Sequence, residues 1–119
     1  MRREFVMTED FDDSWREQSL ADDSLRLLQD ALLGNPDSGS VMRGAGGFRK
    51  VRFALPGCGK SGGVRVIYLD IPEAETLYLM LAYPKSEKDS LSDAEKNQLK
   101  LIAADIKAAL RNRRGRNHV

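Results

Sequence analysis

Hydrophobic residues in the N-terminal third of the chain recur at helical spacing. Phe11 and Trp15 lie four positions apart among charged residues, which predicts a helix over residues 10–21. Residues 4–8 before it have the alternation of a short strand. A second helix is predicted over residues 22–34, because three leucines repeat at helical spacing along it: Leu25, Leu28 and Leu32. The Gly-Asn-Pro sequence that follows ends this helix, since proline cannot continue it.

The centre of the chain changes to a two-residue period. Residues 37–47 contain four glycines and two serines and are predicted to be a connector. In the strand predicted over residues 48–53, successive side chains point to opposite sides. Lys50 and Arg52 therefore share one face of the strand, and Val51 lies on the other.

Two further strands and a last helix complete the pattern. Residues 64–71 and 76–83 are apolar on both faces, which is typical of buried strands, and a turn separates them. Ser92 and Glu95 form an S-x-x-E capping box, which predicts the start of the last helix. Its apolar stripe consists of four large residues with two alanines beside them: Leu99, Ile102, Ile106, Leu110, Ala103 and Ala109.

The whole pattern predicts one α+β domain over residues 1–119. A chain of 119 residues, 41% of them hydrophobic, has enough apolar surface for a single core. We expect a small, largely antiparallel sheet, packed on one side by two N-terminal helices and one C-terminal helix. Residues 111–119 are expected to form a flexible basic tail.

The composition excludes several kinds of site. Cys58 is the only cysteine and His118 the only histidine, so the chain can form neither an intramolecular disulfide nor a cysteine–histidine zinc site, and we expect no metal or cofactor. No apolar run approaches the roughly 18 residues of a membrane helix, and acidic residues near the N-terminus interrupt any signal-peptide core. A reducing, cytoplasmic setting is expected.

Charge is divided unevenly along the chain. Residues 1–40 carry four basic and ten acidic side chains, whereas residues 41–119 carry fifteen basic and eight acidic ones. No acidic residue lies between Asp37 and Asp70, but six cations do: Arg43, Arg49, Lys50, Arg52, Lys60 and Arg65. Such a segment points to a polyanionic partner, and the alternative is an ordinary solvated surface.

Two short motifs suggest chemistry that the rest of the sequence does not support. Residues 59–61 are Gly-Lys-Ser, as in a phosphate-binding P-loop. That motif also needs a glycine where Ala54 stands and a helix after the serine, whereas a strand is predicted there. Cys58 has no histidine near it in the sequence that could activate a thiolate. The basic residues therefore remain as the candidate chemistry.

The basic residues are expected to converge. If the three long strands are antiparallel neighbours in sequence order, one end of the sheet gathers five cations: Lys50, Arg52, Arg65, Lys85 and Lys88. The alternative is that each lies at a sheet edge or pairs with an N-terminal acid. Cations gathered beside apolar strands repel one another unless an anion completes the site, which favours a phosphate-binding role.

Three segments also resemble a known family. They are RGAGGFRKVR at residues 43–52, GKSGGVRVIY at residues 59–68 and YPKSEKDSLS at residues 83–92. These segments and the order of elements resemble the RelE/HigB-type toxins of bacterial type II toxin–antitoxin systems, nearest the HigB branch. The resemblance implies a RelE-like fold and a ribosome-dependent endoribonuclease, or mRNA interferase, that cleaves translated mRNA in the A site without a metal. It also implies a cognate antitoxin with a helix-turn-helix domain, through which the toxin–antitoxin complex binds operator DNA.

The resemblance also implies roles for single residues. Lys50 and Arg52 match the basic pair of the first hairpin strand, and Arg65 matches the arginine of the second. Lys50 would accept the proton of the attacking 2′-hydroxyl, and the arginines would hold the phosphate. Lys85 would assist. We expect further contacts with RNA from five residues around this site: Arg43, Arg49, Lys60, Lys88 and Tyr83.

The sequence departs from the family pattern in two places. Ser86 and Ser92 stand where well-known RelE-type members carry an arginine and a tyrosine, so the general acid is unassigned. The alternative function is that of a RelE/ParE-fold protein without ribonuclease activity, which acts as an antitoxin-binding partner or inhibits DNA gyrase. The arginines on both hairpin strands favour RNA cleavage.

Overall fold

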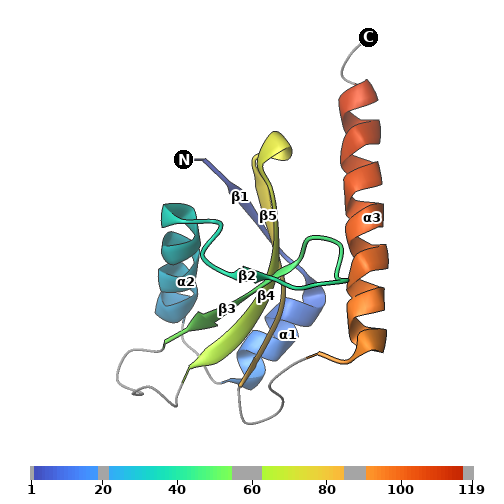
Figure 1. Ribbon diagram of the computed structural model, residues 1–119. Helices are drawn as coiled ribbons and strands as arrows, with labels where there is room; N and C mark the ends of the chain where they lie inside the picture. The colour runs from blue at the N-terminus through green and yellow to red at the C-terminus, as the bar shows by residue number, and fades with distance from the viewer. Residues whose placement is uncertain (1, 19–21, 55–62, 85–90, 117–119) are drawn as a thin grey trace.

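A computed structural model describes residues 2–18, 22–54, 63–84 and 91–116 of the chain. Figure 1 shows the helices arranged around one sheet, and the order of the elements follows the sequence prediction. The elements are β1 (Glu4–Met7), α1 (Glu9–Glu17), α2 (Asp22–Gly34), β2 (Ser40–Val41), β3 (Arg49–Phe53), β4 (Val64–Ile71), the 3-10 turn η1 (Pro72–Ala74), β5 (Thr76–Pro84) and α3 (Asp93–Arg116).

The five strands form one mostly antiparallel sheet. Their order is β1-β5-β4-β3-β2, and only the pairing of β1 with β5 is parallel. The three long strands are antiparallel neighbours in sequence order, so this prediction is confirmed. The pairing of β4 with β5 contains one irregularity, because Ile67 pairs with Leu81 and Tyr68 pairs with Leu79. The two-residue β2 lies in the segment that the sequence analysis predicts as a connector without a strand.

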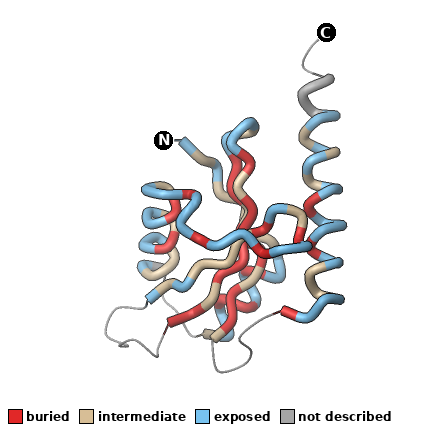
Figure 2. The backbone as a smooth tube through the Cα atoms, viewed as in Figure 1, coloured by how far each residue is buried: buried red, intermediate tan, exposed pale blue. Residues whose placement is uncertain are grey.

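The helices cover both faces of the sheet, so the prediction that they share one side is wrong. On one face, α1 and α2 bury aromatic and leucine side chains against alternate residues of β4 and β5, among them Val66 and Leu79. On the other face, α3 and the connector between β2 and β3 pack against Ile67 and Leu69. Figure 2 shows the buried residues concentrated along the central strands. Strands that are apolar on both faces need cover on both, and that requirement separates the helices.

Two hydroxyl groups hold α1 on β5. The Thr8 hydroxyl accepts a hydrogen bond from the backbone N–H of Phe11 (3.1 Å) and donates to the Met80 carbonyl (3.1 Å), so it caps the helix and ties it to the strand. The buried Ser14 hydroxyl accepts from the Ala82 N–H (3.0 Å). Helix α1 ends at Glu17, four residues earlier than predicted, with Gln18 as its C-cap.

Helix α3 begins as predicted. Ser92 and Glu95 form both hydrogen bonds of the capping box, at 3.0 and 3.1 Å. The helix continues through Arg116, so most of the segment predicted as a flexible tail is helical. Of its predicted apolar stripe, Leu99 and Ala103 are buried, whereas Ile102 lies at the exposed edge.

The connector between β2 and β3 fits closely against α3. Gly46 has a φ of +70°, and a Cβ atom there would lie 2.9 Å from the Ala103 Cβ and 3.0 Å from the Lys100 Cα. The Lys107 ammonium group donates to the Gly46 carbonyl at 3.0 Å. Gly44, two residues earlier, has a similar φ of +78° but open space around it.

These two glycines allow a matched test of the packing between the connector and α3. Gly44→Ala introduces only the strain of a left-handed alanine and should lower the free energy of unfolding by about 1 kcal/mol. Gly46→Ala adds a clash with the helix backbone and should lower it by about 3 kcal/mol. Urea unfolding followed by circular dichroism measures both values. Equal losses in the two variants would show that α3 does not press on the connector.

Candidate nucleic-acid interface

Basic side chains from neighbouring strands meet on the α3-facing side of the sheet. Arg52 of β3 lies directly opposite Arg65 of β4, and Arg65 lies opposite Tyr83 of β5. In the next row along the sheet, Lys50 pairs with Ile67 on one side and with Ser40 on the other. Directly opposite residues have side chains on the same face, so three cations lie close together, as predicted.

The alternation in β3 is also as predicted. Val51 and Phe53 pack against the core beneath α1 and α2, which is the face opposite to that of Lys50 and Arg52. In Figure 1 the paired ends of β3 and β4 that carry Arg52 and Arg65 point away from α3, so the helix does not cover them.

The cations line an open depression. Its volume is about 530 Å³, and its lining consists of Ser38, Ser40, Lys50, Val51, Arg52 and Arg65. No acidic side chain is among these lining residues. Among the described residues Arg52 and Arg65 form no ion pair, whereas Arg3, Arg16 and Arg49 do. Two arginines that face each other, with no acid among the described residues that line the depression, favour an anion between them, and a phosphate group fits this requirement.

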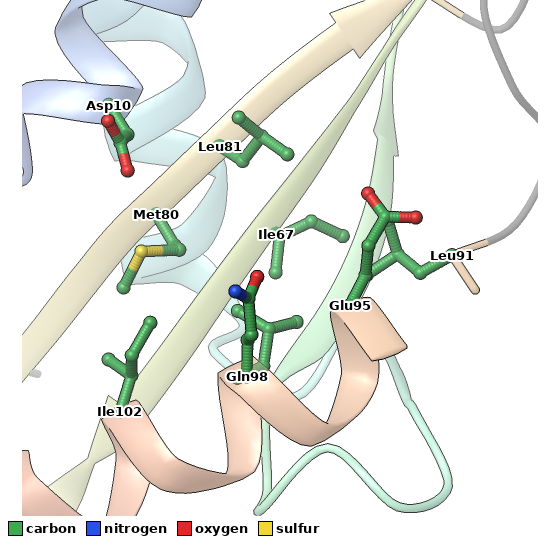
Figure 3. Close-up of a pocket in the computed structure, with 9 residues that line it drawn as sticks. Asp10, Ile67, Met80, Leu81, Leu91, Glu95, Gln98 and Ile102 are labelled. Atoms are coloured by element: carbon green, nitrogen blue, oxygen red, sulfur yellow. The ribbon is translucent and has the colours of Figure 1, made fainter. Parts of the chain in front are cut away.

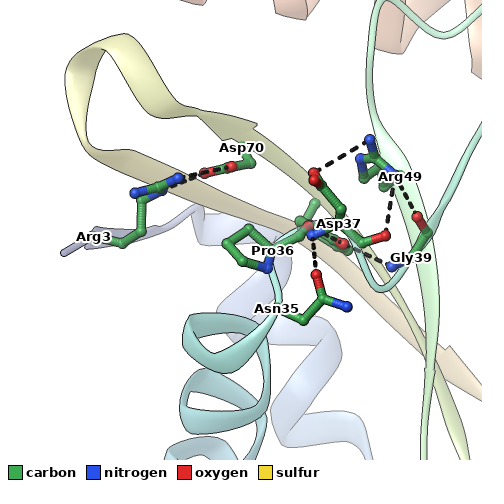
Figure 4. A network of polar contacts seen from close by, with 8 residues as sticks. Arg3, Asn35, Pro36, Asp37, Gly39, Arg49 and Asp70 are labelled. Carbon is green, nitrogen blue, oxygen red and sulfur yellow. Dashed lines mark hydrogen bonds and ion pairs between the residues drawn. The ribbon is translucent and has the colours of Figure 1, made fainter. Parts of the chain in front are cut away.

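Arg49 points to a different place and has a structural role. Its guanidinium donates to the carbonyls of Gly39 (2.7 Å) and Asp37 (3.3 Å), and it lies 3.4 Å from the Asp37 carboxylate (Figure 4). It pairs across the sheet with Tyr68, so it belongs to the face opposite the depression. The contact with RNA expected for Arg49 therefore has no geometric support in the depression.

The hydroxyl of Tyr68 holds the same segment, which runs from Pro36 to Gly39. The ring is fully buried, and its hydroxyl donates to the Pro36 carbonyl (2.6 Å) and accepts from the Gly39 N–H (2.9 Å). Together with Arg49 it fixes the chain between α2 and β2, which carries Ser38 and Ser40 into the depression. No sequence pattern described above predicts this role for Tyr68 or Arg49. A tyrosine inside a strand that is apolar on both faces is the available signal, because a buried hydroxyl needs a partner.

Comparison with known proteins gives the family. Residues 4–114 match the family described as the RelE toxin of the RelE / RelB toxin–antitoxin system. The chain belongs to the RelE toxin family. A solved structure of a mutant of the E. coli toxin RelE in the free state has a similar fold, with a TM-score of 0.50. The two sequences are 17% identical, and the match covers 75% of this chain and 90% of that chain.

The other predicted site residues of this RelE-family toxin are not among the described residues that line the depression. Tyr83 lies beside Arg65, but only 3% of its surface is exposed, so its ring is not available for stacking on a base. Arg43 is exposed on the connector between β2 and β3 and does not line the depression. Three predicted lysines, together with Ser86, lie outside the described residues: Lys60, Lys85 and Lys88.

A second hollow in the toxin has a different character. It lies where α3 crosses β4 and β5, and Figure 3 shows Ile67, Met80 and Ile102 lining it. Its volume is about 140 Å³, and Asp10 and Glu95 lie at its rim. A small apolar hollow with carboxylates beside it does not suit a polyanion, so the depression on β3 and β4 remains the candidate site.

Among the described residues, no group of three or more histidine, cysteine, aspartate or glutamate side chains could hold a metal ion. None of the helices that the structure describes is both long and apolar enough to cross a bilayer.

The Tyr68 anchor can be tested with a matched pair of variants. Tyr68→Phe leaves the Gly39 N–H and the Pro36 carbonyl without their partner, and should lower the free energy of unfolding by about 2 kcal/mol. Tyr78→Phe removes the hydroxyl of a half-buried tyrosine on the neighbouring strand β5, for which no hydrogen bond to a described residue is found, and should change it by less than about 0.5 kcal/mol. Urea unfolding measures both. A loss for Tyr68→Phe no larger than that of the control would contradict the anchoring role.

Proposed function

We propose that this RelE-family toxin is a ribosome-dependent endoribonuclease of a type II toxin–antitoxin system that cleaves translated mRNA. The observation that carries the proposal is the Arg52–Arg65 pair, which lies beside Lys50 in a depression with no acid among its described lining residues. The function as a toxin follows from the family, and the reaction is inferred from these three side chains.

The proposed reaction is a phosphoryl transfer within the RNA strand. The 2′-oxygen of one nucleotide forms a bond to the adjacent phosphorus, its proton passes to the Lys50 amine, and the bond from phosphorus to the 5′-oxygen breaks. Arg52 and Arg65 would stabilise the negative charge of the pentacovalent intermediate through forked N–H donors. The departing 5′-oxygen takes a proton from a general acid that we leave unassigned. Lys85, outside the described residues, is proposed to assist.

The distribution of charge supports an oriented approach to RNA. Residues 9–34, which include α1 and α2, carry eight acidic and two basic side chains, and the two helices cover one face of the sheet. The cationic depression opens on the opposite face. A polyanionic surface such as ribosomal RNA would attract one side of the toxin and repel the other, so the depression would meet the mRNA.

We further propose that the toxin has a cognate antitoxin as its partner and acts in the cytoplasm. A cognate antitoxin, by the resemblance a helix-turn-helix protein, would hold the toxin inactive and carry the complex to operator DNA. The toxin would act in the cytoplasm, where translating ribosomes present the mRNA.

Substitutions in the depression should abolish toxicity. Lys50→Ala should lower the rate of mRNA cleavage by at least about 100-fold, as expected for the loss of a general base. Arg65→Ala should have a similar effect through lost stabilisation of the intermediate. Arg26→Ala, an exposed arginine on α2, is the matched control and should retain wild-type activity. Induced expression with growth curves, and primer extension on a translated message, measure these effects.

A subtler variant separates geometry from charge. Arg52→Lys keeps the positive charge but loses the fork of donors that matches a phosphate, so cleavage should fall by about 10-fold. Retention of the full rate would mean that Arg52 acts only through its charge.

The outcome for the wild-type toxin decides between the two functions. Cleavage ends within the reading frame of a translated message are expected. Growth arrest without such ends, together with loss of negative supercoiling in a reporter plasmid, would instead support gyrase inhibition.

A further inference from the structure

Two serines line the depression together with the cations. Ser40 is the cross-strand partner of Lys50, so the two side chains leave the sheet on the same face with their Cβ atoms about 5 Å apart. Ser38 lines the same depression from the segment that precedes β2. Both serines are exposed, and neither hydroxyl forms a hydrogen bond with another described residue.

Hydrogen bonds hold the backbone that carries these serines, but none to a described residue holds their hydroxyls. Tyr68 binds the carbonyl of Pro36 and the N–H of Gly39, while Arg49 binds the carbonyl of Gly39 (Figure 4). The Asp37 N–H donates to the Asn35 side chain (3.1 Å), and the Ser38 N–H donates to the Asn35 carbonyl (3.1 Å). The fold therefore uses the backbone around the serines and does not use their hydroxyls. Preorganised polar groups of this kind are suited to contact a ligand.

The spacing of the sheet shows which part of RNA would meet the serines. Arg52 and Lys50 are two residues apart on β3, or about 7 Å, and Ser40 lies one strand further out, at about 5 Å from β3. A phosphate held between Arg52 and Arg65 would place the sugar on its 5′ side near Lys50. The neighbouring surface is then uncharged and rich in hydroxyl groups, which suits a ribose and not a second phosphate.

We propose that Ser38 and Ser40 form a hydroxyl wall that binds the ribose of the nucleotide whose 2′-hydroxyl attacks. The wall gives the site its preference for RNA over nucleic acid that lacks this hydroxyl. The inference rests on the proposed function for the identity of the ligand, and it adds two positioning residues that act through hydrogen bonds to the sugar. Ser40 would hold the 2′-oxygen beside Lys50, and Ser38 would contact the same sugar from the segment between α2 and β2.

The test is a binding experiment that does not depend on cleavage. A short single-stranded RNA and its 2′-fluoro analogue, which has no 2′-hydroxyl to donate or attack, are titrated into the ¹⁵N-labelled full-length toxin. Backbone amide shifts are expected at residues 49–52 and 64–66, and also at residues 38–41. The Ser38→Ala, Ser40→Ala double variant should bind RNA about 3- to 10-fold more weakly and the analogue almost unchanged, since a lost neutral hydrogen bond has an effect of this size. Ser24→Ala on α2 is the matched control and should behave as wild type.

The binding data separate the ribose site from the phosphate site. A double variant that keeps the full preference for RNA, or amide shifts confined to β3 and β4, would overturn the hydroxyl wall while leaving the phosphate site intact. Absence of shifts anywhere on this face would overturn both. If the wall binds RNA as expected but the toxin leaves no cleavage ends in translated mRNA, the proposed function fails and the ribose site stands.

Discussion

The structure depends on the burial of β4 and β5 on both faces. Their alternate residues form two separate cores, one beneath α1 and α2 and one beneath α3 and the connector that precedes β3. Each fully buried leucine or isoleucine contributes about 1.5–3 kcal/mol through the hydrophobic effect, so neither face can be left open. The positions of all three helices follow from this requirement. The ends of β3 and β4 lie beyond the cover of α3, and there the sheet has room for exposed side chains.

That uncovered end carries the Arg52–Arg65 pair, for which no acidic partner is found among the described residues. A cross-strand pair of arginines destabilises a sheet by a few tenths of a kcal/mol to about 1 kcal/mol. Elsewhere the chain does pair its arginines: Arg3 forms a 2.7 Å ion pair with Asp70 in which both side chains are at most 10% exposed. The hydrogen bond to Asp70 raises the pKa of Arg3, since it stabilises the protonated guanidinium. The contrast between a well-paired arginine and the Arg52–Arg65 pair indicates that the latter is kept for a ligand.

Much of this arrangement could be predicted from the sequence. The two-residue period placed Lys50 and Arg52 on one face, and the capping box located the start of α3, because both signals depend only on nearby residues. Because β4 and β5 are apolar on both faces, cover on both sides could be predicted, but helix periodicity does not say which helix covers which face. The hydroxyl wall was also missed. In the sequence Ser38 and Ser40 look like ordinary connector residues. Their position depends on Tyr68, almost thirty residues later, whose hydroxyl binds the Gly39 N–H between them.

The register of β3 links the fold to the site. A slip of one residue would turn Lys50 and Arg52 toward the core beneath α1 and α2 and expose Val51 in their place. Burying two cations would cost several kcal/mol, and Arg49 would lose its hydrogen bonds to Asp37 and Gly39, between α2 and β2. The apolar residues and Arg49 therefore hold the register from one face, and the cations are displayed on the other as a consequence. The same bonds from Arg49 position the serine segment, so one strand sets both the phosphate side and the sugar side of the depression.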